Sequence, residues 1–195
     1  MNKRDFLSAS ALIGAGSLVS APASAATATA GPALLTVGGL VPQSNRAALD
    51  PALDQMMFKH GVKFSHAFTF DAAALQNLPK VSIRPTLEYD GKEHILTGPT
   101  LINVLSAAGV KPDPSLRLGI RAVDGYNVMI SVADVMAYRM IMATHIDGVP
   151  MALGSLGPQW AVYDADRLAA FKDKPLKDRF GLCPWGAYYI DVAQG

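Results

Sequence analysis

The sequence lacks the features that would tie it to several large classes of protein. It has a single cysteine, Cys183, so no disulfide can form within the chain. No apolar run approaches the roughly 20 residues that a membrane-spanning helix needs. Positive and negative charges are also nearly balanced, with 17 Lys and Arg and 16 Asp and Glu. This balance excludes a general nucleic-acid or anionic-membrane binder, which needs a surplus of positive charge.

Several catalytic motifs are also missing. The chain contains no G-x-S-x-G elbow, no glycine-rich phosphate loop, no H-E-x-x-H and no C-x-x-C. Nucleophilic hydrolysis, nucleotide binding and dithiol redox chemistry therefore have no support. The histidines do not follow the compact spacing of zinc ligands, so we predict no metal site among them; they are His60, His66, His94 and His145.

What the chain does have is the composition of one ordinary globular domain. It is 195 residues long and 50% hydrophobic, with 17 Gly and 13 Pro. A chain of this size buries roughly two-thirds of its surface on folding, so it needs neither metal nor disulfide for stability.

The first 25 residues have the pattern of a bacterial signal peptide. Lys3 and Arg4 precede the moderately apolar stretch 6–19, and Ala23-Ser24-Ala25 supplies the small residues of a cleavage site. We therefore predict a signal peptide over 1–25, a linker over 26–33, and a mature domain over 34–195 in the periplasm.

The export route stays open between two alternatives. Residues 2–8 resemble a twin-arginine signal, although Lys3 stands in place of the first arginine. The twin-arginine route carries folded proteins and the general secretion route unfolded ones, and a lone cysteine is compatible with either.

Periodicity and turn residues predict an α+β domain with mixed β-sheets and short helices. Asp-Gly pairs predict hairpins over 81–96 and 116–132, because such pairs favour tight turns between strands. Asp71 is expected to cap a short helix. The other expected elements are strands over 34–41, 62–70, 140–146, 160–163 and 187–192, and helices starting at 51 and spanning 72–78, 100–108, 133–138 and 164–171.

Four stretches resemble the sulfite-oxidase-like molybdopterin-binding oxidoreductase family. They are FDAAALQNLP (70–79), LTGPTLINVLSAAGV (96–110), DGVPMALGSLGPQWAVY (147–163) and WGAYYIDV (185–192). Together they extend over almost all of the mature chain, so the resemblance implies the fold of that family and a molybdopterin cofactor.

The resemblance also implies where the metal ligand would lie. Catalytic members bind molybdenum through a cysteine in a T-L-Q-C-like motif, whereas residues 86–89 here read Thr-Leu-Glu-Tyr. Tyr89 thus stands where the thiolate should be, and phenolate oxygen is a harder ligand than sulfur. We therefore do not expect stoichiometric cysteine-ligated molybdenum. Cys183 belongs to another motif; it is either a replacement ligand or, as is commoner for a lone cysteine, a small buried residue.

A basic segment upstream of Trp185 corresponds to the region that grips the pterin phosphate in the family. Arg179 is the residue expected to form a charge-assisted fork to such a phosphate. The alternative is a solvated basic turn, because Lys172, Lys174 and Lys177 alternate with acidic residues.

Two functions remain near equals on these grounds. One is an exported molybdopterin-type oxidoreductase acting on a small oxyanion or sulfoxide with a redox partner protein. The other is a non-catalytic binding module that uses the former cofactor cleft for a pterin, another anion or a partner protein. The eight methionines lie mostly on apolar segments, so a copper or haem carrier is a distant third.

Overall fold

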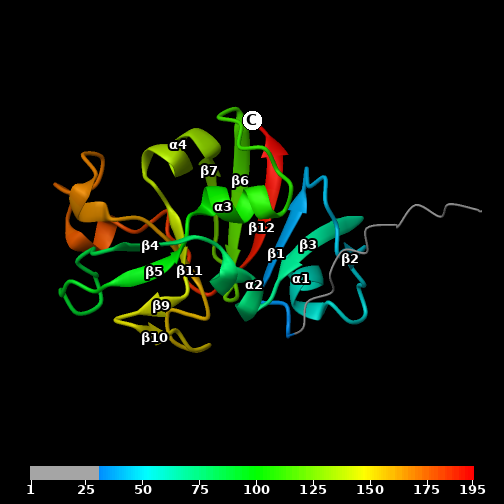
Figure 1. The fold of residues 1–195 in the computed structure, drawn as a ribbon, viewed down its shortest axis with the longest axis horizontal. Coiled ribbons are helices and arrows are strands. Elements are labelled where there is room, and N and C mark those ends of the chain that lie inside the picture. Colours follow the sequence, from blue (N-terminus) through cyan, green and yellow to red (C-terminus); the bar gives the residue numbers. More distant parts are fainter. Residues whose placement is uncertain (1–30) are drawn as a thin grey trace, which may run out of the picture.

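The computed structural model describes residues 31–195, so the predicted signal peptide and most of the linker lie outside the described residues. Three sheets and a few short helices make up this part of the chain (Figure 1). The strands are β1 Leu35–Gly39, β2 Arg46–Ala47, β3 His66–Phe70, β4 Lys80–Ile83, β5 Leu96–Pro99, β6 Leu116–Ala122, β7 Asn127–Ser131, β8 Ile141–Ala143, β9 His145–Ile146, β10 Val149–Pro150, β11 Trp160–Val162 and β12 Ala187–Gln194. The helices are α1 Gln55–Lys59, α2 Ala72–Asn77, α3 Leu101–Ala107 and α4 Val132–Ala137, with 3₁₀ turns η1 Ala165–Arg167 and η2 Leu176–Asp178.

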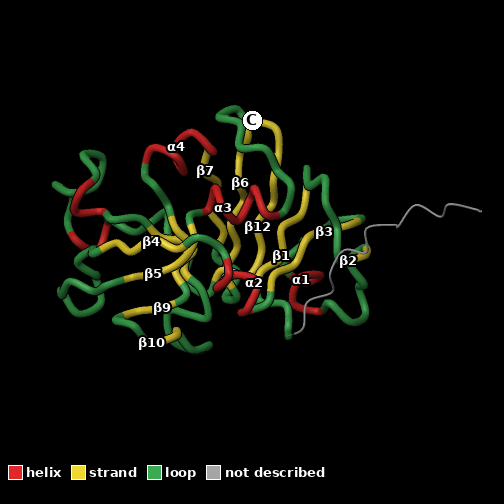
Figure 2. Tube along the Cα trace, in the orientation of Figure 1, coloured by secondary structure: helices red, strands yellow, loops and turns green. Residues whose placement is uncertain are grey.

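The largest sheet joins the two ends of the described chain. Its order is β2-β3-β1-β12-β6-β7, and β1 runs parallel to β12 while the other pairs are antiparallel. A second sheet has the order β10-β9-β5-β4, and β11 pairs with β8 in a third. Figure 2 shows that loops connect most of these strands and that helices are few and short. The mixed α+β class predicted from the sequence is thus confirmed.

Local signals explain the helix starts. The side chains of Asp71, Thr100 and Ser131 accept hydrogen bonds from backbone N–H groups of the first turns of α2, α3 and α4. Such caps satisfy donors that have no partner within the helix. Helix α3 buries Leu101, Val104 and Leu105 against the sheets, as its apolar spacing predicts.

A glycine allows the second and third sheets to approach each other. A Cβ atom at Gly98 would lie 2.0 Å from the backbone oxygen of Met142. Only a residue without a side chain fits there, so β5 can lie directly against β8. The core around this contact includes Trp160 and Tyr163, which are 1% and 0% exposed.

Several predicted elements need correction. The first helix starts at Gln55 rather than Pro51, and the second strand covers only His66–Phe70. The 140–146 strand is two strands, β8 and β9, because the chain passes from one sheet to another at Thr144. The expected 164–171 helix is only the single turn η1, since Leu168 is already extended (φ −100°, ψ 121°).

The 81–96 hairpin also has a longer connection between its paired strands than predicted. Its paired strands are β4 and β5, and beyond them only Thr86 and Glu93 form a bridge. The tip of this hairpin is tied to the β9–β10 turn by His94. The His94 ring places Nδ1 2.6 Å from Asp147 Oδ2 and Nε2 3.0 Å from Asp90 Oδ2.

We predict that this tie makes stability depend on pH. The hydrogen bonds and charges of the two carboxylates raise the pKa of His94 above its ordinary 6.5, and the bonds from His94 lower the pKa of Asp147 and Asp90 below 3.8. The tie therefore stabilises the fold fully between pH 3.8 and 6.5. It is lost as pH rises through the raised pKa of His94, or falls through the lowered pKa of the carboxylates.

The measurement is the difference in Tm between wild type and His94→Gln across this range. The difference should be largest near about pH 5.5 and shrink toward about pH 9. His145→Gln is the control, because the His145 ring is bonded to the Thr144 hydroxyl rather than to a carboxylate. A difference for His94→Gln that is constant with pH would contradict the charged tie.

Candidate functional site

One pocket brings together two of the three residues expected to bind a cofactor. It has a volume of about 260 Å³, and both Tyr89 and Cys183 line it. Tyr89 lies at the tip of the β4–β5 hairpin, and Cys183 lies in the loop before β12, so the fold joins positions 94 residues apart. The remaining lining residues are Glu88, Ala122, Asp124, Tyr126, Lys177, Phe180, Gly181 and Trp185.

Backbone pairing with β11 places the Cys183 side of the pocket. Trp160 forms a bridge with Trp185, and the Trp160 indole N–H donates to the Cys183 carbonyl at 2.8 Å. The Cys183 N–H donates in turn to the Phe180 carbonyl at 2.8 Å. These bonds fix the position of the thiol, and they leave Cys183 only 4% exposed.

The thiol is therefore in an unreactive setting. Burial raises the pKa of Cys183 to about 12, with a smaller contribution from the negative charge of Glu88. At neutral pH the sulfur keeps its proton, and a thiol is a much weaker nucleophile and metal ligand than a thiolate.

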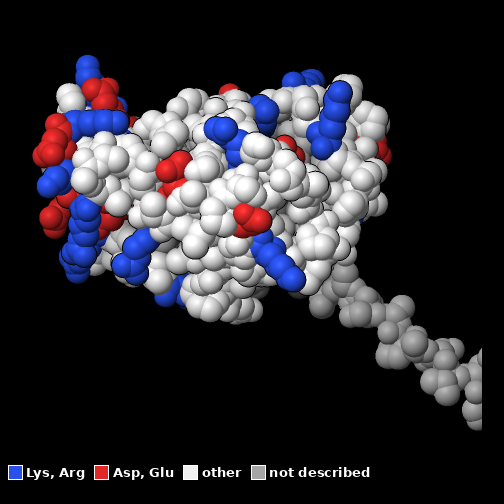
Figure 3. Space-filling view, turned by 90° about the horizontal axis from the view of Figure 1, so that it is seen from above, with Lys and Arg blue, Asp and Glu red and all other residues white. Residues whose placement is uncertain are grey.

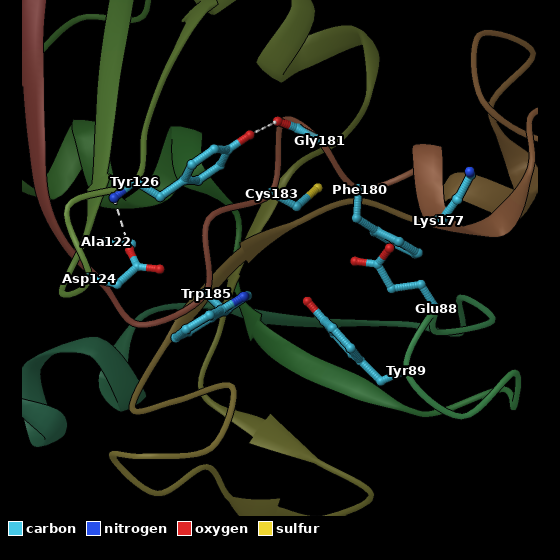
Figure 4. A pocket seen from close by; sticks show the side chains of 10 residues that line it. All are labelled: Glu88, Tyr89, Ala122, Asp124, Tyr126, Lys177, Phe180, Gly181, Cys183 and Trp185. Carbon is cyan, nitrogen blue, oxygen red and sulfur yellow. Dashed lines mark hydrogen bonds between the residues drawn. The ribbon is translucent and has the colours of Figure 1, made fainter.

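Tyr89 presents its polar end to the same space. Although the residue is 56% exposed, its hydroxyl points into the pocket, where it faces the Glu88 carboxylate and the Trp185 indole N–H (Figure 4). Burial and the charge and hydrogen bond of Glu88 raise the pKa of Tyr89 to about 12. A neutral phenol, an indole N–H and a carboxylate thus converge on one point.

Sequence reasoning did not single out Glu88 or Tyr126 for this site. Tyr126 lies at the start of β7, where its hydroxyl donates to the Gly181 carbonyl at 2.8 Å and holds the loop that carries Cys183. Glu88 precedes Tyr89, and only this adjacency could have indicated it.

Arg179, the third expected residue, does not line this pocket. Its Nη1 lies 2.6 Å from Asp166 Oδ1, and its Nε donates to the Lys174 carbonyl at 2.9 Å. The other oxygen of Asp166 accepts from the Thr86 N–H at 2.7 Å. In this structure Arg179 joins the 164–180 segment to the β4–β5 hairpin, and its binding of an anion stays a prediction.

The donor set does not fit a molybdopterin cofactor. Glu88 and Asp124 put two carboxylates around the pocket against one cation, Lys177, whereas the cofactor carries a phosphate. The volume of about 260 Å³ also falls below the roughly 300–1,000 Å³ of pockets for large ligands. Among residues 31–195, no group of three or more His, Cys, Asp or Glu could hold a metal ion.

Comparisons with known proteins place the chain at the level of fold. No protein-family model and no curated protein matches it. The crystal structure of the sulfane dehydrogenase SoxCD from Paracoccus pantotrophus is similar, with a TM-score of 0.53 and 13% sequence identity over 83% of this chain. The match covers 38% of the SoxCD chain, so this protein spans well under half of its length. The likeness shows a distant relation in fold to a sulfur-compound dehydrogenase.

No helix in the 31–195 region is both long and apolar enough to cross a membrane.

We predict that Arg179→Ala destabilises the protein. The side chains of Arg179 and Asp166 are only 19% and 27% exposed, and removing the guanidinium leaves the carboxylate without its charged partner. The cost should be about 1–2 kcal/mol, which lowers Tm by about 2–8 °C in a domain of this size.

Thermal unfolding measures this effect, with Lys172→Ala as the control that removes a positive charge from an exposed position of the same segment. Equal Tm values for the two variants would contradict a structural role for Arg179.

Proposed function

We propose that the protein is an exported binding module that uses a sulfite-oxidase-like scaffold to hold a small planar ligand without catalysis. The observation that carries the proposal is the convergence of the Tyr89 hydroxyl, the Glu88 carboxylate and the Trp185 indole N–H on one small pocket (Figure 4). Export rests on the signal-peptide pattern of residues 1–25 and is part of the proposal.

The polar groups suggest the class of ligand. Glu88 only accepts hydrogen bonds when ionised, while the Trp185 indole only donates and the Tyr89 hydroxyl does both. A pterin ring without metal or phosphate offers the matching edge: an amine and a ring N–H for Glu88, and a neighbouring carbonyl for Trp185 or Tyr89. The aromatic rings of Phe180 and Trp185 supply surfaces against which such a ring can pack.

The net charge of the pocket also favours a neutral pterin ring. With two carboxylates against one lysine, an anionic ligand would meet repulsion, whereas a neutral ring would not. The module would therefore select the pterin ring and reject the phosphorylated cofactor.

The second candidate function is a molybdopterin-type oxidoreductase, and one specific observation favours it. Cys183 and Tyr89 line the same pocket, so the fold does bring a sulfur to the region where the resemblance places the metal ligand. An oxidoreductase would need this thiol to ionise, and its burial opposes that. We therefore rank the binding module first.

The test is a titration of the protein with unsubstituted pterin, in which the fluorescence of the pterin ring reports binding. Glu88→Gln should weaken binding about tenfold or more, because a hydrogen bond to a charged acceptor contributes roughly 1.5–3 kcal/mol. Glu93→Gln is the matched control: it makes the same charge change at an exposed position on the same hairpin tip. Equal losses in both variants, or no pterin binding by the wild type, would refute the proposed ligand.

A further inference from the structure

A second and larger pocket lies on another part of the molecule. Its volume is about 750 Å³, and it is enclosed by β4, the residues just before and after β5, the end of α4, and the turn η1. It shares no lining residue with the pocket of Tyr89 and Cys183. This size is typical of a pocket that holds a complete small molecule.

The charges around this pocket are mainly positive. Arg84, Arg139 and Arg167 line it, against one carboxylate, Asp164. Arg167 Nε lies 3.4 Å from Asp164 Oδ2, so that pair offsets itself. Figure 3 shows that charged side chains of both signs gather at the end of the molecule where the 164–180 segment lies, whereas the rest of that face has fewer of them.

Two guanidinium groups remain available. Within residues 31–195, the side chains of Arg84 and Arg139 form neither a hydrogen bond nor an ion pair. A guanidinium presents a planar fork of donors that suits a carboxylate or a phosphate. Two such forks at one pocket, neither used in folding, point to an anionic ligand.

The backbone at Arg139 provides an independent observation. Arg139 follows the last residues of α4 with φ 51°, and its N–H and that of Met140 bond back to the Met136 and Val135 carbonyls. Helices that end in this way usually have glycine at this left-handed position, because any side chain is strained there. An arginine in its place indicates that the side chain has a use that compensates for the strain.

One residue of the pocket wall has a buried acceptor that folding leaves unsatisfied. Asp164 is 9% exposed, and its Oδ1 is buried with no hydrogen-bond partner in the described part of the chain. Such groups are rare in folded proteins. The remaining wall is largely apolar and includes Ile83, Ile95 and Leu168.

We propose that this pocket binds an organic acid with one carboxylate head and an apolar body. Arg84 and Arg139 hold the head, and the isoleucine and leucine side chains contact the body. Because Arg167 offsets the charge of Asp164, the guanidinium groups of Arg84 and Arg139 set the charge that the ligand meets. This inference does not depend on the pterin proposal, since the two pockets have no residue in common.

Calorimetric titration with octanoate tests the proposal. Octanoate should bind at least about tenfold more tightly than octanamide, which has the same shape without the charge, and more tightly than inorganic phosphate. Arg84→Gln and Arg139→Gly should each weaken octanoate binding about tenfold, whereas Arg117→Gln, at an exposed position on β6, should not.

The glycine variant separates binding from folding. Because glycine relieves the left-handed strain, Arg139→Gly should keep or raise Tm while it loses affinity. Undiminished octanoate binding in both Arg84→Gln and Arg139→Gly would overturn the proposal. So would octanoate binding no tighter than octanamide, or no binding of octanoate at all. If Arg139→Gly lowers Tm, Arg84→Gln alone decides the matter.

Discussion

The pairing of the 159–161 segment with the 183–187 segment is the constraint on which the site depends. Gln159 is fully buried, and its amide donates to the Leu34 and Ala187 carbonyls at 2.6 Å each, so it joins the starts of β1 and β12. The next residue, Trp160, holds the Cys183 carbonyl through its indole. These bonds lie in the core, where a lost hydrogen bond leaves a polar group without water. The thiol of Cys183 is thereby held in place and kept neutral.

Two pockets with different charges and sizes lie on this scaffold. The pocket beside Cys183 is small and partly aromatic, with two carboxylates and one lysine in its lining, which suits a neutral ring that donates hydrogen bonds. The pocket beyond β4 is larger, and its Arg84 and Arg139 have no side-chain partner within residues 31–195, which suits an organic anion. Neither site requires a group to change its protonation state during binding. The fold is distantly related to that of a sulfane dehydrogenase, and the role proposed for this domain is to bind small molecules.

The sequence predicted those parts of the fold that local signals determine. The Asp71 cap and the hairpin between β6 and β7 follow from neighbouring residues, and the structure confirms them. The predicted 164–171 helix was wrong, because the backbone becomes extended at Leu168 after a single turn. Tyr89 and Cys183 line one pocket although they are 94 residues apart, and the position of Arg179 depends on Asp166, which is itself bonded to the hairpin; the tertiary fold sets both arrangements. The left-handed backbone conformation of Arg139 could not be predicted from the sequence. Glycine is the residue that usually indicates such a position after a helix, and it is absent here.

In the proposed binding module, the cleft beside Cys183 holds its ligand without a metal-ligating thiolate. X-ray absorption and elemental analysis of the protein, purified from a host that makes molybdopterin, test it most directly, because they count both the molybdenum atoms per chain and the sulfur atoms around each. We expect molybdenum far below one atom per chain. A stoichiometric centre with a third sulfur beyond the two of the dithiolene, lost in Cys183→Ser, would contradict it.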